Sequence, residues 1–455
     1  MIKFFSFMRS IIVVLQLCLC LLAVETSFAA VSHVIHISID GLRGDLLESY
    51  INSSPQDFPN FKRFVDEGAT TFNGRTDYSN TETLPNHTSM LTGRPVEQPD
   101  GVPNTTHHGY LDNGSLSPTS TLHNSGNPNL SYISSTFDIV HDNGLSTALY
   151  ASKDKFAIYA QSYTASTGAP DTTGADNGRD KIDIHLITPN FISMHNSFLS
   201  DMATVGINYS FLHYLLPDGV GHSAGWDSES WNNSVKTMDT YMGDMFDLIE
   251  TNASLIDDTI IVLTADHGGT GTGHGTATDP ANYTIPVLVW GAGVAPGADL
   301  YSLNPLSRLD PGANRPSYTA SAQPIRNGDT GNLALHLLGL GPVAGSTINA
   351  NQDLVVASDF EADFDANQSV DSHDLTIWQA GYSIAGGAKV NIGDANSDGN
   401  VDGSDFLVWQ RQYGSSLVDT LTPVPEPSSM ILMLLGVICF QQQTKRAGIQ
   451  HWLRI

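Results

Sequence analysis

Short apolar runs alternate with amphipathic segments from residue 33 to residue 340. The runs are rich in β-branched residues, which predicts buried strands, and the segments carry apolar residues at helical spacing. Strands are expected at 34–40, 70–73, 145–151, 206–216, 259–266 and 285–290, and helices at 42–50, 60–68, 132–143, 229–250 and 325–340. This alternation predicts an α/β fold with a mostly parallel central sheet flanked by helices.

Three of the predicted strands lead into side chains that bind metals. In chain order the strands are followed by Asp40, by Asp218 and His222, and by Asp266 and His267. Ligands bind at the carboxyl ends of strands in open α/β sheets, so these side chains are candidates for one site. The segment from Asp218 to His222 contains two glycines, which predicts a glycine-rich turn. Asp40 alone is equally compatible with capping the following helix.

The stretch from Asn80 to Arg94 carries a candidate nucleophile. Pro85 favours the first turn of a helix, because that turn leaves the N–H that proline lacks unpaired anyway. Thr83 is therefore expected just before a helix N-terminus, where free N–H groups and the helix dipole favour an anion. The alternative is that Thr81 or Thr83 only caps this helix.

The strand ends and the neighbouring loops supply one set of donors. Its members are Asp40, Thr83, Asp218, His222, Asp266, His267 and His274, the last in a glycine-rich loop. Carboxylates and imidazoles without thiolate suit Zn²⁺, and less well Mn²⁺ or iron. Two ions about 4 Å apart clamp the attacking and leaving oxygens of a displacement at phosphorus. The set predicts a two-metal hydrolase of phosphate esters.

These motifs resemble the alkaline phosphatase superfamily, and the Thr83 motif is most similar to its type I phosphodiesterase and nucleotide pyrophosphatase branch. The resemblance covers roughly residues 33–345. It rests on Asp40-Gly, Thr83-Leu-Pro-Asn-His with Thr92-Gly-Arg94, Asp218-x3-His222 and Asp266-His-Gly-Gly, in the family's order. It implies one zinc ion on Asp40, Thr83, Asp266 and His267, and another on Asp218 and His222. It also implies that Thr83 forms a phospho-threonine intermediate, which water hydrolyses.

The resemblance assigns two more residues. Asn113 follows His108-Gly109 and matches the family's asparagine that holds a phosphoryl oxygen. In the nucleotide-hydrolysing members the last zinc ligand is a histidine far downstream, after a long insertion that this chain lacks. His274 is the expected substitute, in preference to His336 in the predicted helix 325–340. The pair His107-His108 is more typical of a polar loop than of a metal site.

Two other reactions and one non-catalytic role remain open. A phosphomonoesterase needs cationic groups around a doubly charged substrate, and Arg94, Lys153 and Lys155 are the candidates, although solvated lysines are the commoner case. A sulfatase-like hydrolase is disfavoured, because that branch carries a Cys/Ser-x-Pro-x-Arg motif where this chain has Thr83-Leu-Pro-Asn-His. The non-enzymatic alternative is a degenerate, surface-displayed scaffold, and the intact donor set argues against it.

The segment 356–415 contains a repeated acidic loop. Residues 394–405 place oxygen donors at loop positions 1, 3, 5, 9 and 12, and residues 363–374 repeat this with Gln368 where the other loop has Gly399. The spacing is that of a Ca²⁺ loop, and the doubled loop–helix unit resembles a dockerin-type calcium module. The candidate Ca²⁺ ligands are Asp363, Asp365, Asn367, Asp371, Asp374, Asp394, Asn396, Asp398, Asn400, Asp402 and Asp405. Gln368 makes the first loop the weaker candidate, and a merely acidic linker is the alternative.

The two ends of the chain predict export. Residues 1–30 combine a positive start with an apolar run and small residues at Ala29 and Ala30, which predicts a cleaved secretory signal rather than an anchor. Residues 416–455 contain Val424-Pro-Glu-Pro followed by an apolar run and Lys445-Arg446, which resembles a bacterial PEP-CTERM sorting signal. The resemblance implies transient membrane retention, then release or attachment at the cell surface. The catalytic domain is expected at 31–355.

Charge and cysteine content restrict the partners. The formal net charge of −27 argues against nucleic acid as a partner, because phosphate backbones require lysine and arginine. The three cysteines lie at positions 18, 20 and 439, so the exported part is expected to hold no disulfide. The expected partners are a small-molecule phosphate ester and the membrane sorting machinery. A cohesin-like partner for the calcium module does not follow from the sequence.

Overall fold

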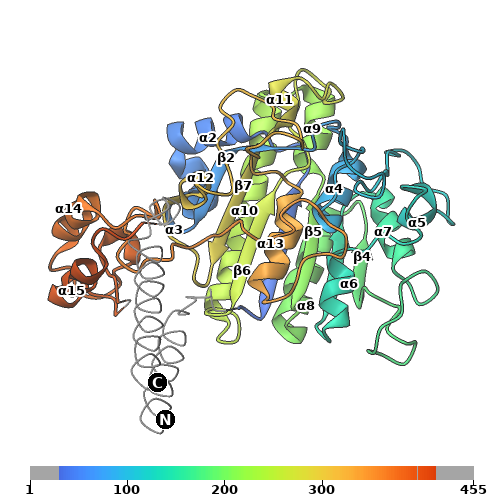
Figure 1. Cartoon of the computed structure of the whole chain (residues 1–455). Helices are drawn as coiled ribbons and strands as arrows, with labels where there is room; N and C mark the ends of the chain where they lie inside the picture. The colour runs from blue at the N-terminus through green and yellow to red at the C-terminus, as the bar shows by residue number, and fades with distance from the viewer. Residues whose placement is uncertain (1–29, 397, 417–455) are drawn as a thin grey trace, which may run out of the picture.

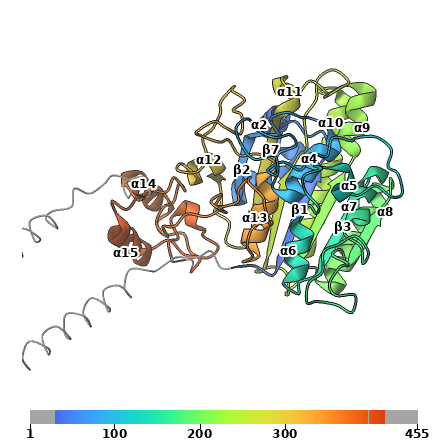
Figure 2. The same cartoon turned by 45° about the vertical axis from the view of Figure 1, so that its right-hand side comes forward.

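The computed structural model describes residues 30–396 and 398–416, which form a large α/β body with a smaller helical module at its side (Figures 1 and 2). An eight-stranded sheet runs through the body in the order β4-β3-β5-β1-β6-β7-β2-β8. The strands are β1 (His33–Ile39), β2 (Ala69–Arg75), β3 (Thr147–Ala151), β4 (Ile184–Ile187), β5 (Tyr209–Tyr214), β6 (Thr259–Thr264), β7 (Thr284–Gly291) and β8 (Ala298–Asp299). Within this sheet only β7 runs antiparallel to its neighbours. The predicted α/β fold with a mostly parallel sheet is confirmed.

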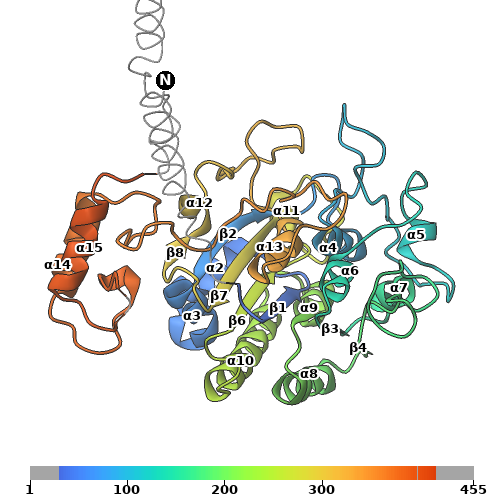
Figure 3. The ribbon, with the colours of Figure 1, turned by 60° about the horizontal axis from the view of Figure 1, so that its bottom comes forward.

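Helices cover both faces of the sheet (Figure 3). One face carries α2 (Gly44–Ser53), α3 (Pro59–Glu67), α8 (Phe191–Val205) and α10 (Glu229–Thr251), and the other carries α4 (Thr83–Thr92), α6 (Thr136–Asp142) and α13 (Asp329–Leu337). Strand β1 serves both layers, because Ile35 and Ile37 pack in the core of the first face and Val34 in the core of the second. All seven residues of β1 are buried, as expected of a strand that is covered on both faces.

Short helices complete the body and lie mainly in the connections. They are α5 (Leu122–Ser125), α7 (Ala157–Ser162), α9 (Leu216–Ala224), α11 (Pro280–Tyr283) and α12 (Leu300–Leu303), with 3₁₀ turns η1 (Pro55–Asp57) and η2 (Asp154–Phe156). Strand β4 was not predicted, because it has four residues and lies at the sheet edge, where apolar patterning is weak. Helix α6 begins four residues later than predicted, where Ser135 and Asp138 form a capping box.

The predicted turn between Asp218 and His222 is wrong, because both residues lie on helix α9. The glycine signal had another cause. A side chain at Gly221 would come within 2.6 Å of the Trp226 ring, and one at Gly269 would come within 2.1 Å of the same ring. These glycines therefore make room for a tryptophan rather than bend the backbone. The helix places Asp218 and His222 one turn apart on one face.

The module at the side of the body consists of two similar halves. Helices α14 (Ser372–Gly381) and α15 (Gly403–Gln412) each follow an acidic loop, and η3 (Val390–Ile392) connects them. In both loops the last aspartate accepts hydrogen bonds from the backbone of the loop's start, 2.7 Å from Phe364 N to Asp374 and 2.9 Å from Ala395 N to Asp405. The halves also cross: the indoles of Trp378 and Trp409 each donate to a carbonyl of the opposite loop, at 2.9 Å.

Gln368 joins this module to the body. Its φ of 63° matches the left-handed backbone of Gly399 in the second loop, so the substitution leaves the loop path unchanged. Its buried side-chain amide donates to the carbonyl of Leu303 in α12 at 3.1 Å. Glutamine therefore stands at a glycine position because its side chain anchors the first loop.

No helix of the described residues combines the length and the apolar composition that crossing a membrane requires. The predicted export signal at 1–30 and the sorting segment at 416–455 lie outside the described residues, except for their inner ends at 30 and 416.

Candidate active site

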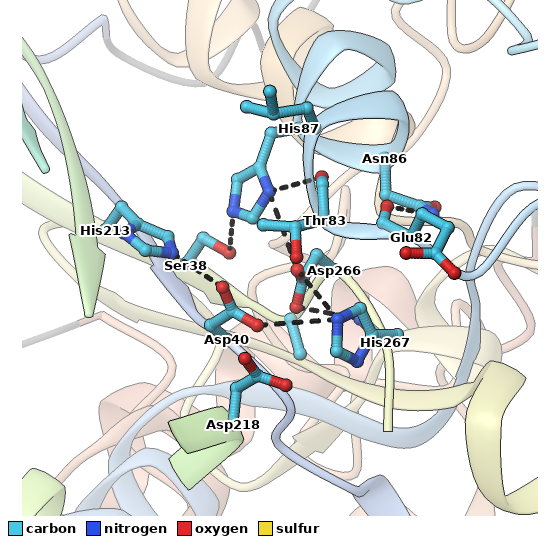
Figure 4. A network of polar contacts seen from close by, with 12 residues as sticks. Ser38, Asp40, Glu82, Thr83, Asn86, His87, His213, Asp218, Asp266 and His267 are labelled. Carbon is cyan, nitrogen blue, oxygen red and sulfur yellow. Dashed lines mark hydrogen bonds and ion pairs between the residues drawn. The ribbon is translucent and has the colours of Figure 1, made fainter. Parts of the chain in front are cut away.

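The predicted donors meet at the carboxyl ends of three adjacent strands, β5, β1 and β6 (Figure 4). Asp40 directly follows β1, helix α9 follows β5, and Asp266 follows β6. Backbone hydrogen bonds tie these segments together: Asp218 N donates to Asp40 O at 3.0 Å, and Gly41 N donates to Asp266 Oδ1 at 3.1 Å. The sheet register thus brings residues more than 200 positions apart into one cluster. The capping alternative for Asp40 is wrong, because Arg43 occupies the N-cap of α2.

The donors form two groups. In the first, His267 Nε2 lies 3.4 Å from Asp40 Oδ1 and 3.2 Å from Asp266 Oδ2, and all three side chains are fully buried. In the second, His222 and His274 place their Nε2 atoms 3.3 Å and 3.8 Å from Asp218 Oδ1. The groups adjoin, because the rings of His267 and His274 stack with centroids 3.6 Å apart. Each group offers three ligand atoms within 4.8 Å of one another.

Thr83 is the first residue of α4, one position further into the helix than predicted. The N-cap is Glu82, whose side chain makes no capping hydrogen bond, and the Thr81 hydroxyl donates to His274 O. The capping alternative for both threonines is therefore wrong. The Thr83 side chain is buried and points toward Asp266 and His267 (Figure 4).

The three imidazoles of the site are held in one tautomer. Their Nδ1 atoms lie 2.7–2.9 Å from backbone carbonyls: His222 from Thr272 O, His267 from Gly268 O and His274 from Thr81 O. A carbonyl only accepts, so Nδ1 carries the hydrogen and Nε2 presents a lone pair, as a metal ligand does. Burial lowers the pKa of His267 and lowers that of His274 to about 4, so both rings are neutral at neutral pH.

The donor set fits divalent cations. Asp40 Oδ1, Asp218 Oδ1, Asp266 Oδ2 and His267 Nε2 are buried and have no hydrogen-bond partner among the described residues. Leaving such groups unpaired costs about 1–3 kcal/mol each. Burial, together with the charge of Asp40, raises the pKa of Asp266 above its ordinary value. Cations would satisfy these atoms, and carboxylates with neutral imidazoles are the donors that zinc accepts.

Both candidate lysines lie in the site. Lys153 Nζ is 2.6 Å from Asp40 Oδ2 and from Asp218 Oδ2, so it links the two donor groups. Lys155 Nζ donates to Asn113 Oδ1 at 2.7 Å. The solvated alternative is wrong for Lys153, whose side chain is 19% exposed. Arg94 lies elsewhere and donates to backbone carbonyls, including Thr105 O at 2.7 Å.

Sequence reasoning missed His213 and the structural role of His87. His213 Nε2 lies 2.9 Å from Asp40 Oδ2, and His87 bonds to Ser38 Oγ at 2.8 Å and to Thr83 O at 2.7 Å. Burial lowers the pKa of His213 to about 4, so it donates to the Asp40 carboxylate as a neutral ring. The available signal was a histidine inside a buried, mainly apolar and aromatic strand, β5.

Two other histidine sites lie outside the cluster. His108 is buried and bonds to Ser89 Oγ at 3.1 Å, so it supports its loop. His336 lies near the end of α13, where Leu337 O accepts a hydrogen bond from Val31 N. Val31 precedes β1 whereas Asp40 follows it, so His336 is at the opposite end of the sheet from the donors.

The fold and the donor set define a hydrolase of the alkaline phosphatase superfamily. Residues 34–307 match the sequence model of the type I phosphodiesterase / nucleotide pyrophosphatase family, and the chain belongs to that family. The family typically binds two metal ions, in agreement with the two donor groups. Residues 423–446 match the PEP-CTERM protein-sorting motif, which indicates an exported protein sorted to the cell surface.

Curated relatives match over a short stretch. GPI ethanolamine phosphate transferase 1 of Chaetomium globosum is 34% identical over 102 residues, covering 20% of this chain and 11% of that protein. The same transferase of Emericella nidulans is 36% identical over 89 residues, or 20% of this chain and 10% of that protein. The matches thus span about a tenth of the length of these relatives.

Solved structures are similar over most of the chain. One is an inactive variant of murine ectonucleotide pyrophosphatase / phosphodiesterase 5 in complex with AMP, with 15% identity, 71% of this chain and 99% of that chain covered, and a TM-score of 0.47. Another is a mutant of the alkaline phosphatase PafA, with 12% identity, 72% and 100% covered, and a TM-score of 0.48.

Proposed function

We propose that this chain is an exported two-zinc hydrolase of phosphodiesters or nucleotide pyrophosphates, with Thr83 as the nucleophile. One observation carries the proposal: a buried hydroxyl at a helix N-terminus points toward one of two adjoining three-residue donor groups whose imidazoles all present Nε2. Asp40, Asp266 and His267, with Thr83, would hold one ion, and Asp218, His222 and His274 the other. When bound, the ions would supply positive charge that favours the ionised hydroxyl and the negative charge on the phosphoryl and leaving oxygens.

The chain's own residues account for the steps. Thr83 Oγ releases its proton to solvent and bonds to phosphorus, and the bond from phosphorus to the leaving oxygen breaks, with that oxygen taking a proton from water. Water then cleaves the phospho-threonine ester and restores the hydroxyl. His213 holds the Asp40 carboxylate in place, and His87 fixes the first turn of α4 through Thr83 O. Asn113 supplies a side-chain amide near the reacting group.

A phosphomonoesterase is the second candidate. Monoesters carry one more negative charge than diesters, and Lys153 and Lys155 lie where added positive charge would act. However, Lys153 is already paired with two carboxylates, and Glu82 adds a negative charge beside Thr83. This balance of charge favours the diester.

A parallel assay tests the reaction class. The mature chain loaded with Zn²⁺ is expected to hydrolyse bis-p-nitrophenyl phosphate with kcat/KM about tenfold or more above that for p-nitrophenyl phosphate, because about 1.4 kcal/mol of charge discrimination gives that ratio. p-Nitrophenyl sulfate should show no turnover. A faster reaction with the monoester would assign the chain to the phosphatases instead.

For the module we propose two Ca²⁺ ions, one in each acidic loop. Asp363, Asp365 and Asp374 already place one oxygen each within 4.8 Å of the others, and burial raises the pKa of Asp363 to about 7. The second loop has the same backbone hydrogen bonds, because Gly399 N donates to Asp394 at 2.8 Å as Gln368 N does to Asp363 at 2.7 Å. This likeness supports a dockerin-type module.

Calcium is expected to stabilise the module. Excess Ca²⁺ at about 100 times Kd should add about 2.7 kcal/mol per loop to its free energy of unfolding, because the ions bind only the folded loops. Differential scanning calorimetry with Ca²⁺ or with EGTA measures the shift. Asp374→Asn with Asp405→Asn should abolish it, whereas the exposed Asp247→Asn on α10 should leave it unchanged. A shift that survives the double substitution would contradict the assignment.

A further inference from the structure

The side chain of Asn113 is held between a cation and an anion. Its Oδ1 accepts from Lys155 Nζ at 2.7 Å and from Leu84 N at 3.1 Å, and its Nδ2 donates to Glu82 Oε2 at 2.6 Å. The three partners come from the 3₁₀ turn η2, which follows β3, and from the start of α4. Two elements that also carry Lys153 and Thr83 therefore fix this loop residue.

The chemistry of these partners allows only one orientation of the amide. An ammonium group and a backbone N–H only donate, and a carboxylate only accepts. A flipped amide would turn its NH₂ group toward Lys155 and Leu84, and its oxygen toward Glu82, so all three hydrogen bonds would be lost. The identities of Oδ1 and Nδ2 therefore follow from which of the three partners donate and which accept.

The position of Glu82 is itself fixed. Glu82 N donates to Asn80 Oδ1 at 2.7 Å, and Asn86 Nδ2 donates to Glu82 O at 3.1 Å. The residue occupies the N-cap of α4, yet its side chain does not cap the helix. Instead Asn113 Oδ1 accepts the N–H of Leu84, and the Glu82 carboxylate is left to hold Asn113.

One consequence concerns the anion site. The N–H of Leu84 is occupied by Asn113, so it is not available to a phosphoryl oxygen at the start of α4. Nδ2 carries two hydrogens, and within the described part of the chain one of them goes to Glu82. The other hydrogen makes Asn113 a donor beside Thr83.

We propose that Glu82 and Lys155 are positioning residues that act through Asn113 and lock its amide so that it meets a phosphoryl oxygen as a donor. This inference rests on the proposed function for the identity of the ligand. It assigns the glutamate before the nucleophile a role in orienting the amide, and no direct contact with the substrate.

A double-mutant cycle tests the proposal. Asn113→Ala is expected to lower kcat/KM for bis-p-nitrophenyl phosphate about 10²-fold, as loss of one anion-stabilising donor does. Glu82→Gln should lower it about tenfold, because a neutral glutamine holds the Asn113 amide less firmly than a carboxylate does. The double variant should match Asn113→Ala within about twofold, because Glu82 has nothing left to orient. Lys155→Met should behave like Glu82→Gln, and the exposed Glu229→Gln should leave the rate unchanged.

The same cycle is measured in the affinity for inorganic phosphate by calorimetry of the zinc-loaded protein, so the result does not depend on turnover. If the losses of the two single variants multiply in the Glu82/Asn113 double variant, to about 10³-fold in all, the role proposed for Glu82 is overturned. If the losses multiply only when Lys155→Met is combined with Asn113→Ala, then Lys155 acts on the anion directly. That result would overturn the role proposed for Lys155. If the phosphate affinities show the expected pattern but the protein hydrolyses no ester, this inference is retained and the proposed function is rejected.

Discussion

Thr83→Ala is expected to lower kcat/KM for a phosphodiester by at least about 10⁴-fold. The change removes the atom that bonds to phosphorus, and removal of a nucleophile typically costs a factor of that size or more. Because Asp40, Asp266 and His267 remain, the protein should still bind metal, and its free energy of unfolding should change little. Stopped-flow or steady-state assays with bis-p-nitrophenyl phosphate measure the loss.

Thr83→Ser is the matched control, because it keeps the hydroxyl and removes one methyl group. Its kcat/KM should stay within about 10²-fold of the wild-type value. Its zinc content, measured by inductively coupled plasma mass spectrometry, should be unchanged. Full activity in Thr83→Ala would remove this residue from the nucleophile's role. A wild-type protein that binds no metal and turns over no ester would instead favour the scaffold alternative.

His274→Ala is expected to lower the zinc content from about two ions per chain to about one and to reduce kcat/KM by about 10²-fold or more. His274 belongs to the donor group with Asp218 and His222, and loss of one of three protein ligands opens that group to water. The remaining group keeps its three donors, so one ion should stay bound.

His336→Ala is the control for the histidine that the sequence left as an alternative. His336 lies on α13 at the amino end of β1, away from the donors, so metal content and kcat/KM should match the wild type. A loss of zinc in His336→Ala, with none in His274→Ala, would reverse the assignment.

The sequence predicted the sheet well because its central strands are rich in β-branched and aromatic residues. It also placed acids and histidines at the ends of those strands, since a strand that stops at Asp40 or Asp266 is visible in one dimension. The order of strands is not visible in this way. Lys153 reaches Asp40 and Asp218 only because β3 lies beside β5 and β5 beside β1, which no local pattern reveals.

Glycine misled the prediction at one place and informed it at another. Between Asp218 and His222 the glycines indicated a turn, whereas the structure uses the missing side chain of Gly221 to seat Trp226 against α9. In the loop around Gly271, with φ of 57°, the glycine signal did mark a bend that carries His274 to the site. The difference depends on packing partners distant in sequence, so single-sequence reasoning had no means to separate the two cases.

The hydrogen bond from Gln368 to the Leu303 carbonyl has a consequence for how this protein was assembled in evolution. A module joined by a free linker can be shuffled between enzymes without loss, but this one shares a buried amide with the enzyme it accompanies. Exchange with an unrelated module would strand the Leu303 carbonyl unless glutamine came with the newcomer. We therefore expect the catalytic body and this module to have been inherited together.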